Sequence, residues 1–133
     1  MQRFRDYFPN SERAKQAQDI IFELQDKLVY KELLNAQLYY NLGNYMGNNY
    51  QSAIITAQNA LKEYPYTRYK ETLSMLILKS KYQEAVQSIE EKKPERFRDV
   101  IDEYYSFIND YPSGEYSKEA ENIFKVANKY VKD

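Results

Sequence analysis

The chain has 133 residues, of which 43% are hydrophobic and 29% charged, a balance typical of a folded globular domain. Its 19 basic and 20 acidic residues nearly cancel, which argues against the basic footprint of a nucleic-acid-binding or polybasic membrane-surface protein. The sequence contains neither histidine nor cysteine. This excludes Ser-His and Cys-His catalysis, zinc sites made of imidazole or thiolate ligands, and redox dithiols. We expect no metal and no cofactor.

The first predicted element covers residues 11–44, with Ser11 as a candidate N-cap. Apolar residues recur in it every three or four positions, the period of a helix with one buried face. The stripe expected to be buried consists of Ala14, Ala17, Ile21, Leu24, Leu28, Leu34, Leu38, Leu42 and Tyr45. Neither Gly nor Pro falls between Asn10 and Leu42. The pattern therefore predicts one long helix, or two helices with a bend near Val29.

Gly and Pro residues separate the elements that follow. A turn cluster from Gly43 to Asn49 ends the first element, and Pro65 ends the second. A charged loop covers residues 90–94, in which Pro94 suits the first turn of a helix. The further helices are expected over residues 50–64, 67–89, 94–111 and 116–131. No segment shows sustained alternation of apolar and polar residues, so the sequence predicts an all-α protein.

Three segments share an aromatic residue followed by Pro and then a nearby Ser or Thr. They are residues 7–13, 63–69 and 110–116, with Pro-to-Pro spacings of 56 and 47 residues, longer than the 34 of a plain tetratricopeptide repeat. Tyr50, Ala53, Ala60 and Pro65 fit the second helix of that repeat. We predict one domain over residues 1–133: an α-α superhelix of tetratricopeptide-like helical hairpins with five to six helices.

Several runs of residues carry a family resemblance. The first-half runs are residues 38–43, 50–55 and 61–67, and the second-half runs are residues 91–93, 96–97, 101–105 and 111–113. With these runs the chain resembles the tetratricopeptide lipoprotein of the outer-membrane β-barrel assembly machinery, the BamD type, and its second half is similar to members from Bacteroides-like bacteria. Only the C-terminal part of the family pattern is present, so we expect the chain to be the C-terminal portion of a longer protein.

The resemblance implies a non-enzymatic scaffold at the periplasmic face of the outer membrane. Family members bind the periplasmic domains of the barrel-forming insertase through their C-terminal repeats, and their N-terminal repeats are thought to receive unfolded outer-membrane proteins. A lipidated Cys anchors the family to the membrane. This chain has no Cys and no visible signal peptide, so a lipid anchor outside this chain is implied by the resemblance alone.

The partner-binding surface is expected on the outer stripe of the helix after Tyr50 and in the turn 64–70. The candidate residues are Thr56, Asn59, Glu63, Tyr66, Arg68 and Lys70. The resemblance places Thr56 where proteobacterial members carry an Arg that helps dock the barrel subunit, so the docking chemistry is expected to differ here. Ile55 points nearly opposite the core, and we expect it to pack on the next helix of the stack, with a partner contact as the alternative.

Tyrosine is unusually frequent, with 15 residues, and its rigid amphipathic ring suits both packing and recognition. Four tyrosines at core spacing are expected to pack: Tyr64, Tyr104, Tyr111 and Tyr116. Four others fit the stripes less well and are candidates for surface recognition: Tyr30, Tyr39, Tyr66 and Tyr105.

Two other functions remain open. A generic tetratricopeptide adaptor that clamps a peptide or a C-terminal carboxylate would need a concave basic clamp, which Lys62, Arg68 and Lys70 alone do not make. A carboxylate-based enzyme would need a buried pair of acids. Asp99 and Glu103 are better explained as part of a solvated, charged helix face.

Overall fold

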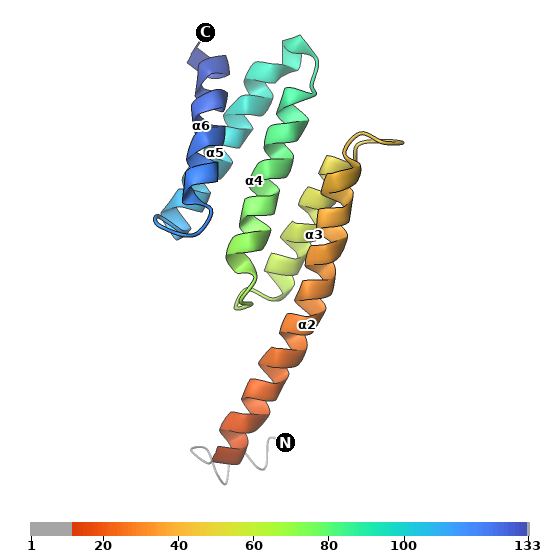
Figure 1. The fold of residues 1–133 in the computed structure, drawn as a ribbon, viewed down its shortest axis with the longest axis vertical. Coiled ribbons are helices and arrows are strands. Elements are labelled where there is room, and N and C mark those ends of the chain that lie inside the picture. Colours follow the sequence, from red (N-terminus) through yellow and green to blue (C-terminus); the bar gives the residue numbers. More distant parts are fainter. Residues whose placement is uncertain (1–11, 133) are drawn as a thin grey trace.

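The computed structural model describes residues 12–132, which form five α-helices and a short 3₁₀ helix (Figure 1). In chain order they are α2 Glu12–Leu42, α3 Asn49–Glu63, α4 Lys70–Val86, η1 Glu90–Lys92, α5 Lys93–Asp110 and α6 Ser117–Lys132. Residues 12–132 contain no strand, and the all-α prediction is confirmed. The predicted N-cap Ser11 and nearly all of the first aromatic–Pro segment lie outside the described residues.

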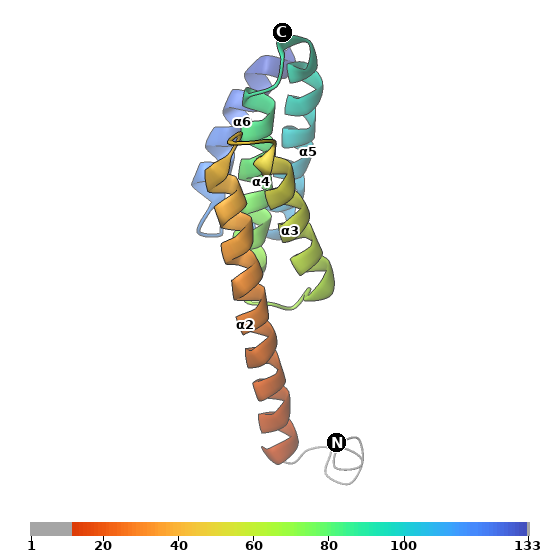
Figure 2. The ribbon, with the colours of Figure 1, turned by 90° about the vertical axis from the view of Figure 1, so that its right-hand side faces the viewer.

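The helices stack as a superhelix of hairpins. Each helix packs against its neighbours in sequence, and α4 also contacts α2 and α6. Turned by 90°, the stack shows α2, α4 and α6 in one layer and α3 and α5 in the other (Figure 2). Such a stack presents its faces as extended surfaces, because each helix is covered only by its near neighbours.

The first helix is continuous, with no break at Val29. Its 31 residues correspond to about 46 Å at 1.5 Å per residue, and its N-terminal half projects well beyond the other helices (Figures 1 and 2). Gly43 follows the helix with a φ of +57°, the left-handed conformation that ends many helices. Asn48 then caps α3, because its side-chain oxygen accepts a hydrogen bond from the Gln51 N–H at 3.2 Å.

The two aromatic–Pro turns within the described residues have nearly the same backbone. Tyr64 ends α3 with φ −130° and ψ 69°, and Tyr111 ends α5 with φ −135° and ψ 67°. Each tyrosine N–H donates to the carbonyl four residues earlier, that of Ala60 or Phe107. The pair α3–α4 therefore corresponds to the pair α5–α6, as the sequence repeat predicts.

Two clusters of buried side chains share the central helix α4. The first, between α2, α3 and α4, contains Val29, Leu33, Ala36, Ile54, Ala57, Ala60, Leu73, Leu76 and Ile77. The second, between α4, α5 and α6, contains Met75, Leu78, Ala85, Phe97, Val100, Phe107, Ala120, Ile123 and Ala127. Because α4 contributes to both clusters, it joins the two halves of the stack.

The predicted buried stripe of the first helix is wrong. Its large members Ile21, Leu24, Leu28, Leu34, Leu38 and Leu42 are 41% to 57% exposed. The face that packs on α3 and α4 instead carries Val29, Leu33 and Ala36. Counting 100° per residue, the two apolar faces of α2 lie roughly 140° apart. Periodicity detects both faces, and it does not show which one the rest of the chain covers.

Most of the other predictions for the helices agree with the structure, with small differences in where the helices begin and end. The third predicted helix is shorter than 67–89, because residues 64–69 form the turn; Val86 and Ile89 are exposed. Pro94 lies in the first turn of α5, as predicted. Ile55 is 47% exposed, so its predicted packing on another helix is wrong within residues 12–132. The four tyrosines expected to pack are half-buried, and the four expected at the surface are exposed.

Candidate protein-interaction surface

A pocket of about 300 Å³ opens where α2 passes the turn between α3 and α4. We call it the Asp26 pocket. One wall consists of Phe22, Gln25 and Asp26 from α2, and the other of residues 63–67 at the end of α3 and in the turn. The pocket therefore joins the projecting helix to a turn that lies about 40 residues later in the chain.

The Asp26 carboxylate ties α2 to this turn. It accepts a hydrogen bond from the Thr67 hydroxyl at 2.6 Å and one from the Arg68 side-chain Nε at 3.0 Å. The Arg68 backbone N–H also donates to it, at 3.4 Å. The Thr67 hydroxyl in turn accepts from the Tyr69 N–H at 3.3 Å. Carboxylate hydrogen bonds are stronger than neutral ones, so they hold the turn in one position against α2.

These contacts favour the charged form of Asp26. The hydrogen bond from Thr67 lowers the pKa of the Asp26 carboxyl below its usual value, and the bonds and positive charge of Arg68 lower it further, although burial opposes them. Asp26 in turn raises the pKa of the Arg68 guanidinium. Both groups are charged at neutral pH.

Exposed aromatic side chains lie at the pocket. Tyr66 is 87% exposed at the tip of the turn, and Phe22 is 43% exposed on α2. Glu63 adds a negative charge to the same lining. Nearby, the Tyr30 and Tyr69 rings lie 5.5 Å apart between α2 and the turn. Aromatic residues and Arg are enriched at protein-binding sites, so Tyr66, Phe22 and Arg68 are the residues here that suit such a site.

The structure brings together half of the six predicted partner-binding residues. Glu63 and Tyr66 line the Asp26 pocket. Arg68 does not line it but forms an ion pair with Asp26, which does. Lys70, the first residue of α4, is exposed and does not line it. Thr56 is half-buried and Asn59 exposed, and both lie further back along α3, outside the lining.

The α2 wall of this pocket was missed by the sequence analysis. Phe22, Gln25 and Asp26 fall outside the predicted stripe, and nothing local connects them with the turn. One signal was available: Phe22, Asp26 and Val29 follow one another at spacings of four and three, so they share a helix face. The structure buries this face at Val29 and leaves Phe22 43% exposed at the pocket.

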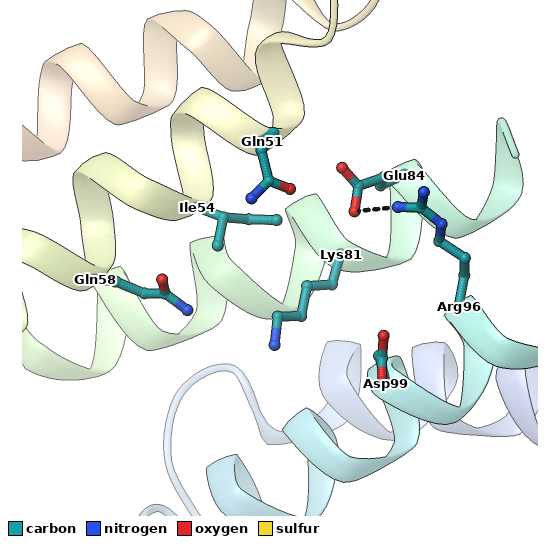
Figure 3. A pocket seen from close by; sticks show the side chains of 7 residues that line it. All are labelled: Gln51, Ile54, Gln58, Lys81, Glu84, Arg96 and Asp99. Carbon is teal, nitrogen blue, oxygen red and sulfur yellow. Dashed lines mark ion pairs between the residues drawn. The ribbon is translucent and has the colours of Figure 1, made fainter.

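A second pocket, of about 320 Å³, lies between α3, α4 and α5 (Figure 3). Its charged groups are largely paired with one another. Arg96 of α5 binds Glu84 of α4 at 2.9 Å, and Asn48 donates to the other Glu84 oxygen at 2.8 Å. Lys81 at the same pocket pairs with Glu103 at 2.8 Å. Arg96 and Glu103 therefore connect α5 to α4, whereas the sequence had suggested a solvated face.

A third and smaller pocket, of about 150 Å³, lies between α2, α4 and Tyr116, the residue before α6. Leu33, Met75 and Leu76 supply apolar lining, and Lys79 supplies a positive charge. The Lys79 ammonium lies 5.0 Å from the Tyr40 ring centroid and 3.8 Å from Glu119. The pocket therefore combines apolar and polar lining residues with one lysine.

Within residues 12–132, no helix has the length and apolar character that a bilayer span requires. The same part of the chain holds no group of three or more acidic side chains arranged to bind a metal ion. The sequence matches no protein-family model, and no curated protein matches it significantly. The resemblance to the β-barrel assembly lipoprotein therefore remains a prediction.

Proposed function

We propose that this chain is a non-enzymatic scaffold subunit in outer-membrane β-barrel protein assembly. In this proposal it docks the periplasmic domains of the barrel-forming insertase. The observation that carries the proposal is the Asp26 pocket, where Glu63 and Tyr66, both chosen from the sequence as partner-binding residues, meet Phe22 of α2. The choice of the insertase as partner comes from the family resemblance.

The pocket is suited to binding a folded partner because its walls are already fixed. The hydrogen bonds of Asp26 to Thr67 and Arg68 hold the turn against α2, so little conformational freedom is lost on association. Tyr66 and Phe22 can then contribute apolar contact area, while Glu63 and Arg68 select the charge of the partner.

Localisation follows from the same proposal. The protein would work at the periplasmic face of the outer membrane, held by a lipid anchor outside this chain. Unfolded outer-membrane proteins are a further proposed class of partner, which the resemblance assigns to the family's N-terminal repeats. No nucleic acid is proposed as a partner, because the net charge is −1.

Isothermal titration of the chain with the insertase periplasmic domains of the same organism tests the proposal. We expect saturable one-to-one binding, and a loss of affinity of about tenfold or more for Tyr66→Ala and for Glu63→Lys. Tyr105→Ala and Glu91→Lys are the matched controls, because both residues are exposed on other parts of the fold, and they should bind normally. An absence of heat and of co-elution, or equal losses in the controls, would contradict the proposal.

A generic adaptor that binds a peptide is the second candidate. The third pocket supports this candidate, because its lining includes the apolar residues Leu33, Met75 and Leu76 and the Lys79 ammonium. An adaptor would bind short peptides with a free C-terminal carboxylate and would lose them in Lys79→Met. If the chain instead docks the insertase through the Asp26 pocket, Lys79→Met should leave the titration with the insertase domains unchanged, because Lys79 does not line that pocket.

A further inference from the structure

The face of α2 that points away from the other helices carries a heptad pattern. Its apolar members Ile21, Leu24, Leu28, Leu38 and Leu42 alternate spacings of three and four with two polar members, Lys31 and Asn35. We call these seven residues the outer seam. All seven are exposed, and no described residue covers them. Alternating spacings of three and four are the signature of helices that pair in coiled coils.

The outer seam is open along its whole length. The body of the protein packs on the opposite face of α2, through Val29, Leu33 and Ala36, and α2 runs along the edge of the stack (Figures 1 and 2). Ile20 and Leu34 widen the seam with exposed apolar area at its margin. So many exposed large apolar residues on one helix face are uncommon on a protein without a partner at that face.

The seam is complementary to itself when two copies run antiparallel. In the register where the two residue numbers add to 66, Leu24 faces Leu42 of the second copy, and Leu28 faces Leu38. Lys31 faces Asn35 of the second copy, so each polar residue meets a polar residue. A parallel pair would instead place Lys31 against Lys31, and the two positive charges would repel each other.

Two further apolar residues lie just beyond the end of α2. Tyr45 and Met46 are 69% and 90% exposed in the turn that follows the helix. In the antiparallel pair the N-terminal part of the second copy's α2, which carries Ile20 and Ile21, would run past this turn.

We propose that the outer seam binds a second copy of this chain in an antiparallel, two-fold symmetric pair centred at residue 33. The central Lys31–Asn35 layers would fix the register, as single polar layers do in coiled coils. The helices overlap over residues 24–42, about 28 Å. Because the contact is short, we expect a reversible association.

Sedimentation velocity over a range of micromolar concentrations measures the association. We expect a concentration-dependent monomer–dimer equilibrium that Leu28→Glu shifts at least tenfold toward monomer. Ile89→Glu replaces an apolar residue that is 63% exposed elsewhere and should leave the equilibrium unchanged. Circular dichroism and thermal unfolding would show that both variants fold. A monomer at every concentration, or equal effects of the two variants, would overturn the proposal.

Cysteine cross-linking tests the direction, because the chain has no cysteine of its own. Leu28→Cys and Leu38→Cys chains with tags of different size are mixed and oxidised. The antiparallel register predicts a disulfide between the two different chains. It predicts none between two Leu28→Cys chains, whose cysteines would lie ten residues apart, about 15 Å. Cross-links only between identical chains would overturn the antiparallel pair. If the outer seam instead binds a helix of another protein, this chain alone stays monomeric. That result would overturn the proposal as well.

Discussion

Replacing Asp26 by Asn removes one charge from the contact between α2 and the α3–α4 turn and keeps the shape of the side chain. Asp26 accepts from the Thr67 hydroxyl at 2.6 Å, and its side chain is only 16% exposed. A hydrogen bond to a charged group contributes roughly 1.5–3 kcal/mol and a neutral one roughly 0.5–1.5 kcal/mol. The exposed ion pair with Arg68 adds little. We therefore expect Asp26→Asn to lower the free energy of unfolding by about 1 kcal/mol at neutral pH.

The effect should depend on pH with a definite sign. The pKa of Asp26 is lower in the folded protein than in the unfolded chain, where it is about 3.9. Its charge therefore stabilises the fold above the unfolded pKa, and that contribution is lost as the pH falls through the folded pKa. The stability difference between the parent chain and Asp26→Asn should shrink below about pH 4.

Urea unfolding followed by circular dichroism, at neutral pH and at about pH 3, measures both quantities. Asp102→Asn is the control, because Asp102 is exposed on α5 and its replacement should change stability little at either pH. If Asp26→Asn were as stable as the parent at neutral pH, or if the difference stayed constant as the pH fell, the role given to this carboxylate would be refuted.

Three further changes test other parts of the fold by urea unfolding. Gly43→Ala should cost about 1–2 kcal/mol, because φ is +57° there and a Cβ would lie 2.8 Å from the Tyr50 hydroxyl; an unchanged midpoint would show that the turn relaxes. Phe97→Ala should cost about 3–5 kcal/mol, since the ring is fully buried and stacks on Tyr130 at 4.2 Å; a loss below about 1 kcal/mol would contradict that packing. A double-mutant cycle of Arg96→Met and Glu84→Gln should give a coupling of about 1 kcal/mol for the 2.9 Å pair, and additive effects would show that the pair is not formed in solution.

Helix ends were the most predictable part of the structure, because they depend on local chemistry. Gly43 adopts the left-handed conformation that ends α2, and Pro65 and Pro112 follow helices that end at Glu63 and Asp110. Each of these residues favours a helix end by itself, because Gly adopts the left-handed conformation without strain and Pro lacks the N–H that a helix needs. The same local rule explains why the two aromatic–Pro turns have nearly equal backbone angles.

The choice of buried face on α2 was not predictable from periodicity. The outer seam carries larger apolar residues, Ile21, Leu24 and Leu28, than the buried face, which includes Ala36. The buried face suits its neighbour α3, which presents Ala57 and Ala60, so the two backbones can approach closely. Complementarity between two helices is a property of both sequences together, and a pattern within one helix does not contain it.

Only the residues that the α3–α4 turn contributes to the candidate site were predictable from the sequence. Glu63, Tyr66 and Arg68 lie in or next to a turn that the aromatic–Pro motif marks. Phe22 and Asp26 lie at the same pocket because α2 is continuous and long enough to pass the turn. That arrangement depends on how α2 packs on α3 and α4. It could not be predicted, because the sequence pattern had indicated the wrong buried face of α2.

Amide chemical-shift mapping with the insertase periplasmic domains tests the central claim most directly. A ¹⁵N-labelled chain is titrated with the unlabelled domains, and the shifts of its backbone amides are followed. The proposed docking function predicts saturable shifts concentrated at residues 22–26 on α2 and residues 63–68 at the turn, with α6 little affected. An absence of shifts, or shifts confined to α5 and α6, would contradict the claim that the Asp26 pocket docks the insertase.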